Sequence, residues 1–168
     1  MDGNEKVYLS EYNSDWDKHF IDEKRLLQTY FTDIPIEHIG STSIKGMIAK
    51  PIIDIMIGVL SYPPAEDITL TLEKLGYYSF GEADKVHGRL YFIKRGIVDY
   101  NVHVIKYLGK LWNDNISFKD YLNKCEEEVL AYSKIKQCII NKGINTLYEY
   151  SDEKHGFISD ILKKIRLE

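Results

Sequence analysis

The residues best suited to chemistry lie in one short stretch of the chain. Gly40, Ser41, Thr42 and Ser43 follow an apolar segment, and Asp54 comes thirteen residues after Ser41. A glycine lets the backbone approach a ligand closely, and the N–H and hydroxyl groups that follow it can bind phosphate oxygens. An aspartate carboxylate is a hard oxygen ligand for Mg²⁺. The spacing therefore predicts a phosphate-binding turn followed by a strand that carries a metal-binding acid.

Each of these features also has a structural explanation. The Gly-Ser-Thr-Ser segment fits a plain capped turn, and it is not a P-loop because Met47 follows the next glycine, Gly46, where a lysine is required. Asp54 lies between isoleucines, where an ionised carboxylate is costly unless it is paired or binds a metal. Backbone N–H groups or the ammonium of Lys50 would satisfy that carboxylate without any ligand.

A second group of polar residues lies in the predicted strand 97–105. Asp99, Asn101 and His103 alternate with apolar residues, so their side chains share one face of the strand. If this strand lies beside the one that carries Asp54, these side chains line a common cleft. We predict catalytic roles for Asp54, Asp99 and His103. Asp54 and His103 are the predicted metal ligands, and His103 is alternatively a general base or a hydrogen-bonded sheet histidine.

Two cations are best placed to meet a phosphate. Lys50 precedes the strand with the aspartate, and Arg89 begins another predicted strand. An ion pair of Arg89 with Glu82 or Asp84 is the structural alternative. His38 precedes the glycine turn, and structural and functional interpretations of it are equally supported. The predicted nucleotide- or phosphate-binding residues are Gly40, Ser41, Thr42, Ser43, Lys50 and Arg89.

Helices and strands must position these side chains. Apolar periodicity and turn residues predict helices at about 15–31, 65–75, 117–124, 126–142 and 151–165, the last capped by Ser151, and strands at 36–39, 51–59, 77–80, 90–94 and 97–105. The last two strands form a hairpin around Lys94, Arg95 and Gly96. The pattern predicts an α/β (α+β) fold in which a helical C-terminal third packs on a mixed sheet.

Length and composition restrict the class of protein. A chain of 168 residues fits a single domain, 1–168, with a core at about 1–106 and a helical part at about 112–168. The net charge of −4 provides no basic stripe for wrapping nucleic acid, although a small basic pocket remains compatible with it. The N-terminus is unlike a signal peptide, and no apolar run reaches the ~20 residues of a membrane helix. We therefore expect a cytoplasmic protein without membrane partners.

Several short blocks of sequence occur in a characteristic order. They are His38-Ile-Gly-Ser-Thr-Ser43, Gly46, Ala49-Lys-Pro-Ile-Ile-Asp54, Gly88-Arg-Leu-Tyr-Phe92, Asn101-Val-His-Val104 and Phe118-Lys-Asp-Tyr-Leu122. Together they resemble the signature of the GrpB family over nearly the whole chain. The resemblance implies a fold of the nucleotidyltransferase superfamily, but it implies no particular reaction.

One position departs from the nucleotidyltransferase pattern. Those enzymes usually carry a second acid two residues after the first, and Met56 stands there in this chain. Glu37, Glu82 or Asp99 can replace that acid only if the fold brings them close to Asp54. Two hypotheses follow: a nucleotidyltransferase that uses Mg²⁺ or Mn²⁺ and a small-molecule acceptor, or a non-catalytic protein that binds a nucleotide or phosphorylated metabolite. Met56 favours the second, and a cluster of acids favours the first.

Overall fold

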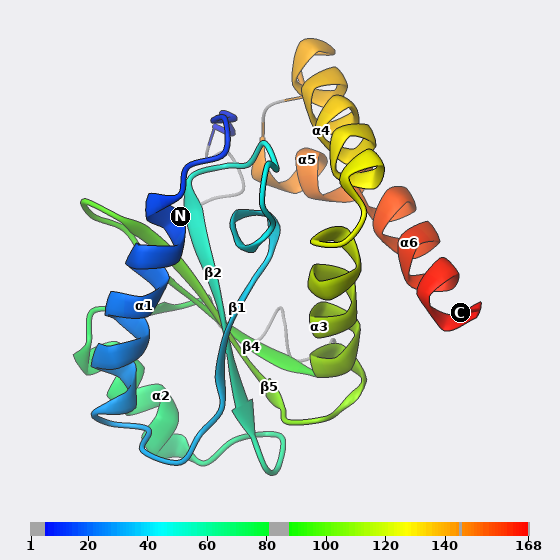
Figure 1. The fold of residues 1–168 in the computed structure, drawn as a ribbon. Helices are drawn as coiled ribbons and strands as arrows, with labels where there is room; N and C mark the ends of the chain where they lie inside the picture. The colour runs from blue at the N-terminus through cyan, green and yellow to red at the C-terminus, as the bar shows by residue number, and fades with distance from the viewer. Residues whose placement is uncertain (1–5, 81–87, 145, 168) are drawn as a thin grey trace.

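A computed structural model of the chain describes residues 6–80, 88–144 and 146–167. In chain order its elements are α1 (Asp15–Gln28), β1 (Ile36–Ile39), the 3₁₀ turn η1 (Ser41–Ser43), β2 (Ile52–Val59), α2 (Glu66–Lys74), β3 (Tyr78–Ser79), β4 (Arg89–Lys94), β5 (Asp99–Lys106), α3 (Lys110–Leu122), α4 (Glu126–Asn141), α5 (Leu147–Glu153) and α6 (His155–Leu167). Helices lie on both sides of a five-stranded sheet (Figure 1). The predicted mixed α/β fold is confirmed.

The sheet places the two strands with polar side chains next to each other. Its strand order is β1-β2-β5-β4-β3, with β2 parallel to β5 and every other neighbouring pair antiparallel. Asp54 of β2 is in register with Asn101 of β5, and Met56 is in register with His103. The two polar segments of the sequence therefore meet at the centre of the sheet.

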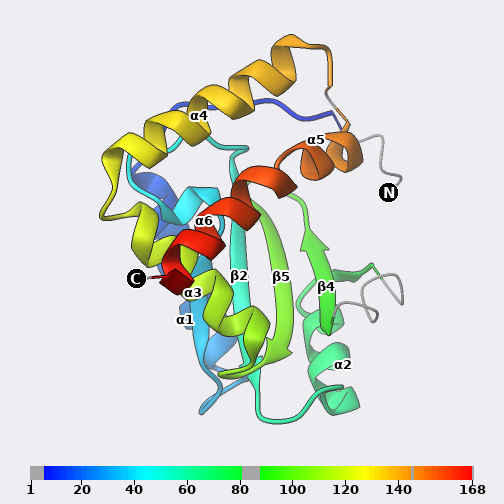
Figure 2. The same ribbon diagram turned by 90° about the vertical axis from the view of Figure 1, so that its right-hand side faces the viewer.

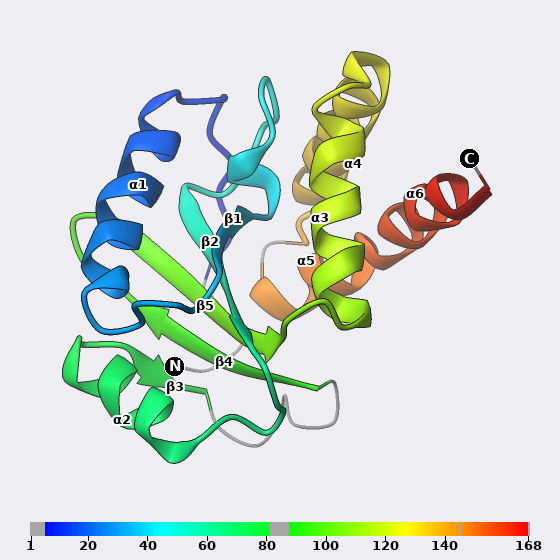
Figure 3. The same ribbon diagram turned by 60° about the horizontal axis from the view of Figure 1, so that its bottom comes forward.

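The centre of one face of the sheet is apolar. Alternate residues of β2, Ile53, Ile55 and Ile57, are fully buried together with Val102 and Val104 of β5. Helices α1 and α2 cover this face, as the view in Figure 3 shows. Because side chains of a strand alternate between faces, the residues between these apolar ones point to the opposite side. That opposite face carries Asp54, Asn101 and His103.

The C-terminal helices cover the polar face only in part. Trp112 of α3 packs against Met56 and Ile105, and a Cβ at Gly58 would come within 2.6 Å of the Trp112 ring. Beyond α3, the helices α4 and α5 lie at the end of the sheet where β2 and β5 begin (Figure 2). Tyr132 of α4 stacks on Phe157 of α6, with ring centroids 4.4 Å apart. The C-terminal helices therefore contact the rest of the fold at two places, through Trp112 at the sheet and through Tyr132 near the segment after η1.

Several predicted boundaries were wrong. Helix α3 begins at Lys110, seven residues before the predicted start, because Trp112 is already buried against the sheet. The predicted helix 151–165 is two helices, and Ser151 lies inside α5 instead of capping a helix. The strand predicted to begin at position 97 begins at Asp99, since Ile97 is fully exposed in the preceding turn.

Candidate functional site

Gly40 brings the predicted phosphate-binding turn directly against the acid of β2. It lies between β1 and η1, with φ 70° and ψ −172°, a conformation that is essentially restricted to glycine. A Cβ at this position would overlap Asp54 Oδ2. Gly40 therefore lies at the junction of β1 and a 3₁₀ turn, and the glycine is required there because the turn passes over the carboxylate.

The Asp54 carboxylate receives its partners from β5. Asn101 Nδ2 donates a hydrogen bond to Asp54 Oδ1 at 2.7 Å, and His103 Nε2 lies 3.6 Å from the same oxygen. Burial alone would raise the pKa of Asp54, but His103, Asn101 and the charge of Lys50 outweigh it and lower the pKa to about 2. The carboxylate is therefore ionised at neutral pH, and its side chain retains 26% of its exposure.

Arg89 fixes the orientation of the histidine ring. Its Nη1 lies 3.4 Å from His103 Nδ1, and a guanidinium can only donate hydrogen bonds. Nδ1 is therefore the acceptor, which leaves the ring proton on Nε2, facing Asp54. The ring of Tyr91 supports both residues, 5.1 Å from the His103 ring and 5.5 Å from the guanidinium carbon. Arg89, His103 and Asp54 form a connected row on the polar face.

Two lysines meet at the other end of the site. The Lys154 ammonium lies 4.3 Å from the centroid of the Tyr150 ring, and the Lys50 ammonium lies 6.0 Å from the same centroid. Burial and the charge of Lys50 lower the pKa of Lys154 to about 7, against an opposing effect of Asp54. Among the residues that the structure describes, none accepts a hydrogen bond from the Lys154 ammonium or forms a close ion pair with it.

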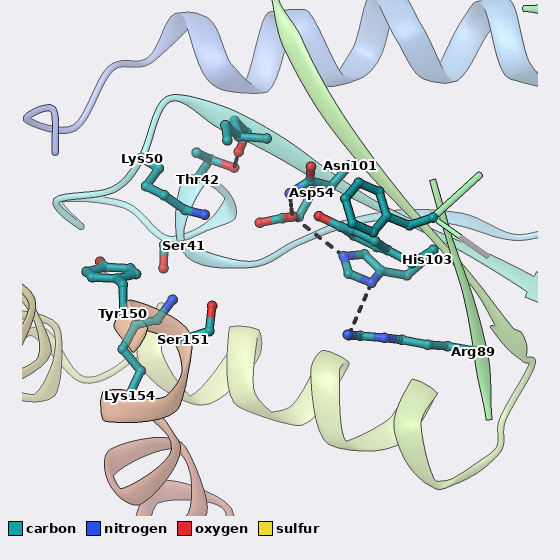
Figure 4. Close-up of a pocket in the computed structure, with 13 residues that line it drawn as sticks. Ser41, Thr42, Lys50, Asp54, Arg89, Asn101, His103, Tyr150, Ser151 and Lys154 are labelled. Carbon is teal, nitrogen blue, oxygen red and sulfur yellow. Dashed lines mark hydrogen bonds and ion pairs between the residues drawn. The ribbon is translucent and has the colours of Figure 1, made fainter. Parts of the chain in front are cut away.

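A cavity of about 350 Å³ joins the two ends. Figure 4 shows the side chains of Ser41, Lys50, Ser151 and Lys154 around one end, with Asp54 toward the other. The complete lining consists of Ser41, Thr42, Lys50, Ile52, Asp54, Phe80, Arg89, Tyr91, Asn101, His103, Tyr150, Ser151 and Lys154. A smaller cavity of about 210 Å³ lies beside it, toward α3, and shares Asp54, Arg89 and His103 with it. The row of Asp54, His103 and Arg89 therefore separates two hollows.

The hydroxyl residues of the turn have different surroundings. Ser43 Oγ donates to Gly40 O at 2.7 Å, and Ser43 is absent from the cavity lining. Thr42 Oγ1 donates to Ile52 O at 3.2 Å and lies 3.1 Å from His38 Nε2. Of the predicted hydroxyl ligands, Ser41 and Thr42 reach the cavity, whereas Ser43 closes the turn.

His38 belongs to the opposite side of the sheet. Its ring stacks on Phe20 of α1, with centroids 4.8 Å apart, and its Nδ1 lies 3.5 Å from Asp17. Burial lowers the pKa of His38 to about 4, against an opposing effect of Asp17. A neutral histidine held between α1 and η1 matches the structural interpretation of this residue.

The acids expected to complete a metal site do not join Asp54. Asp99 is the first residue of β5 and is in register with Ile52, not with Asp54. It accepts a hydrogen bond from Gly96 N at 3.1 Å in the β4–β5 turn. The predicted convergence of Asp99 with Asp54 and His103 is therefore wrong. Glu37 pairs with Lys119 at 3.4 Å, and Glu82 lies outside the described residues.

The metal prediction accordingly stays a prediction. No group of three or more His, Cys, Asp and Glu side chains within the described ranges is arranged to hold a metal ion. His103 Nε2 lies 3.6 Å from Asp54 Oδ1, so the two side chains contact each other directly. Met56 is fully buried beside them. The donors present supply only part of a Mg²⁺ or Mn²⁺ site. Separately, none of the described helices has the length and apolar character needed to cross a membrane.

Sequence reasoning assigned no role in the site to four residues of the C-terminal part of the chain, one of which is Tyr150 of α5 in the cavity lining. Ser151 and Lys154 line the cavity, and Lys136 of α4 donates from Nζ to Ser41 Oγ at 2.8 Å. Lys136 was detectable, since it shares one helical face with Val129, Tyr132 and Ser133, all of them buried. A lysine on an apolar helical face needs a buried partner.

Comparisons with known proteins agree with this architecture. A family model described as GrpB protein matches residues 6–164. The glutamate-rich protein GrpB of Alkalihalophilus pseudofirmus is 34% identical over 168 residues, covering 95% of this chain and 96% of the relative. The crystal structure of the conserved protein GrpB from Enterococcus faecalis matches with a TM-score of 0.83 and 26% identity, covering 94% of this chain and 96% of that one.

A more distant likeness concerns the fold alone. A crystal structure of the Cid1 poly(U) polymerase bound to MgATP matches with a TM-score of 0.50 and 15% identity. The match covers 76% of this chain and 45% of the polymerase. The chain therefore has a fold similar to that of a nucleotidyltransferase.

Proposed function

The chain belongs to the GrpB family, and we propose that it binds a nucleotide or another phosphorylated small molecule in the cavity between the sheet and α5. The observation that carries the proposal is the pair of lysines at one end of the cavity. Lys50 and Lys154 flank the ring of Tyr150, and the Lys154 ammonium has no acceptor among the described residues. Two neighbouring cations in a partly buried site favour an anion between them.

The lining also supports a phosphate over a carboxylate. Ser41 and Ser151 place hydroxyl groups beside the two lysines, so donors approach the same space from β1–η1 and from α5. A phosphate group accepts several hydrogen bonds at once and carries more charge than a carboxylate at neutral pH. We therefore place the phosphate between Ser41, Lys50 and Lys154.

Aromatic walls provide room for the remainder of the ligand. Phe80 and Tyr91 line the cavity beyond Asp54, with their rings edge to face at 5.8 Å. A flat base or other ring can pack on such side chains, as small ligands generally do in largely apolar pockets. The volume of about 350 Å³ lies in the range of pockets for small molecules. These features support a nucleotide as the preferred class.

Isothermal titration calorimetry tests the proposal directly. Pyrophosphate, AMP, ATP and UTP are titrated in metal-free buffer into the wild-type protein and into the Lys154→Met variant. The proposal predicts binding of at least one of these anions to the wild type and a loss of affinity of about 10–100-fold in the variant. Exposed Lys134 provides the matched control, because Lys134→Met removes the same charge from the surface of α4. Equal affinities for all three proteins would contradict the proposed site.

A nucleotidyltransferase is the second candidate, favoured by one observation. Asp54 and His103 lie where the larger cavity meets the smaller one, so an acceptor in the smaller cavity would be next to a nucleotide in the larger. His103 could then hold the acceptor hydroxyl in position for attack on the phosphate. Mg²⁺ or Mn²⁺, when bound, would neutralise phosphate charge, but the described donors do not define its site.

Pyrophosphate release distinguishes the two candidates. A panel of nucleoside triphosphates with Mn²⁺ and a broad set of small acceptors is incubated with the wild type and with Asp54→Asn. Release by the wild type that disappears in the variant would establish a transferase. No release from either protein, together with nucleotide binding, would leave the binding function.

A further inference from the structure

A buried lysine lies directly behind the predicted phosphate-binding turn. Lys136 of α4 is only 1% exposed, and it comes from a part of the chain far from the turn. Its Nζ donates to Ser41 Oγ and to Ile48 O, both at 2.8 Å, and lies 4.3 Å from the centroid of the Tyr132 ring. An ammonium has three N–H donors, so these contacts occupy all of them. Lys136 therefore cannot touch a ligand in the cavity itself.

The contact determines what Ser41 can offer to the cavity. Because an ammonium only donates, Ser41 Oγ must accept from Lys136, and the hydroxyl proton of Ser41 points elsewhere. Within the described part of the chain, the Ser41 hydroxyl donates to no protein acceptor. Ser41 lines the cavity near Lys154 (Figure 4). Its proton is thus available to an acceptor in the cavity.

We propose that Lys136 is a positioning residue of the anion site, which holds Ser41 Oγ so that the serine presents its proton to an oxygen of the bound phosphate. This inference rests on the proposed function, because it assigns a role in binding the same anion. It extends the site into α4, a helix that contains none of the sequence blocks of the signature.

The charge of Lys136 is essential to this role. A neutral amine would have a lone pair for the Ser41 proton, and the hydrogen bond between them would reverse. Burial lowers the pKa of Lys136 well below its usual value, and Lys154 and Lys50 lower it further, whereas Asp54 raises it. Tyr132 of α4 faces the same ammonium. An anion beside Ser41 adds negative charge and favours the ammonium, so binding and the required orientation of Ser41 support each other.

A double-mutant cycle tests whether Lys136 acts through Ser41. Calorimetry with pyrophosphate in metal-free buffer is applied to the wild type, Ser41→Ala, Lys136→Met and the double variant. Each single variant is expected to lose about 10-fold in affinity, the typical effect of losing one hydrogen bond to a charged group. The double variant is expected to bind as Ser41→Ala does, because Lys136 contributes only through the serine. Losses that multiply in the double variant would overturn the inference.

Stability measurements separate this role from a purely structural one. Lys136→Met leaves Ile48 O without its donor and also removes the hydrogen bond to Ser41. Thermal unfolding of all four proteins therefore measures the loss of stability separately from the loss of affinity. Lys136→Gln is the second variant if methionine prevents folding, since its amide can still donate to Ile48 O. Lys134→Met controls for loss of a charge from α4. If the wild type binds no pyrophosphate and no nucleotide, the proposed function fails as well; if it binds with independent losses, only the role of Lys136 fails.

Discussion

The two ends of the cavity differ in how completely the protein satisfies their charges. At one end, the Asp54 carboxylate has Asn101 at 2.7 Å and His103 at 3.6 Å, and its pKa is lowered to about 2. At the other end, Lys154 lies beside another lysine without an acceptor among the described residues, and its pKa is lowered to about 7. A charged group whose partners are already present has little to gain from a ligand. We therefore expect the proposed ligand at the lysine end, which combines Lys50 before β2 with Ser151 and Lys154 of the C-terminal part.

The largest effect on stability is expected from Gly40→Ala, which disrupts the packing around the Asp54 carboxylate. The new Cβ overlaps Asp54 Oδ2 and the backbone lies in a glycine-only region, so we expect a loss of roughly 3–5 kcal/mol in the free energy of unfolding. Urea denaturation measures it. Gly46→Ala is the matched control, because Gly46 also has a positive φ but no atom within 4 Å of the added Cβ. A control loss of about 1–2 kcal/mol isolates the contact with Asp54; equal losses would show that this end is not tightly packed.

Lys154→Met should separate binding from stability at the lysine end. Phosphate-ligand affinity should fall by about 10–100-fold, because a charged donor to the anion is lost. The free energy of unfolding should stay the same or increase, because the variant removes a buried charge next to Lys50. Calorimetry and urea denaturation on the same samples test both parts. A variant that loses stability and affinity together would mean that Lys154 already has an essential partner in the protein.

The pH dependence of sulfate binding should follow Lys154. Sulfate does not titrate near neutral pH, and the ammonium of Lys154, with a pKa of about 7, is lost as pH rises. Affinity is therefore expected to be highest below pH 7 and to fall by up to about 10-fold per pH unit above it. Calorimetry between pH 6 and 9 measures this, with Lys154→Met as the control that should give a much flatter profile. An unchanged slope in the variant would assign the proton to another group.

The free protein should show the opposite trend in stability. The unfolded chain keeps the Lys154 proton up to its usual pKa of 10.5, whereas the folded chain releases it near pH 7. The unfolded state therefore binds more protons between these values, and the contribution of Lys154 to the free energy of unfolding rises with pH. The difference between wild type and Lys154→Met should decrease across the same range.

The carboxylate end was largely predictable from sequence, and the lysine end was not. Period-two alternation predicted that Asn101 and His103 share one face of their strand. The pairing of β2 with β5 then brings Asp54 next to them. Alternation also placed Asp99 on that face, but it could not reveal that Asp99 lies at the start of β5 and bonds to the turn. Two side chains come together only if they share a face of the sheet and also lie at matching positions along their strands.

The lysine end depends on long-range packing. Lys154 and Ser151 reach the cavity because α5 and α6 are separate helices, and the sequence pattern predicted one continuous helix. Their approach to Ser41 is set by contacts such as Tyr132 on Phe157 and Tyr150 in the apolar cluster with Val7. Local periodicity carries no information about such contacts. Lys136 alone left a local signal, a charged residue on a buried helical face.

The smallest effect, and the one that decides between the two candidate functions, is expected from Asp54→Asn. The amide can still accept from Asn101 Nδ2, so the fold should persist. Removing a negative charge from the cavity proposed to bind an anion should tighten pyrophosphate binding in metal-free buffer by no more than about 3-fold, because Asp54 lies at the opposite end of the cavity from the two lysines.

Calorimetry with and without Mn²⁺ then tests whether Asp54 binds a metal ion. If the carboxylate end only supports the fold, Mn²⁺ has the same small effect on nucleotide affinity in both proteins, and the two ends keep separate roles. If Asp54 holds a metal, Mn²⁺ tightens nucleotide binding in the wild type and not in the variant, since an amide lacks the charge that a hard cation needs. In that case Asp54, which has Asn101 and His103 beside its Oδ1, would supply carboxylate oxygen to the metal. Gly40 would then support the metal site indirectly, because its missing Cβ leaves room for the Asp54 carboxylate beside the turn.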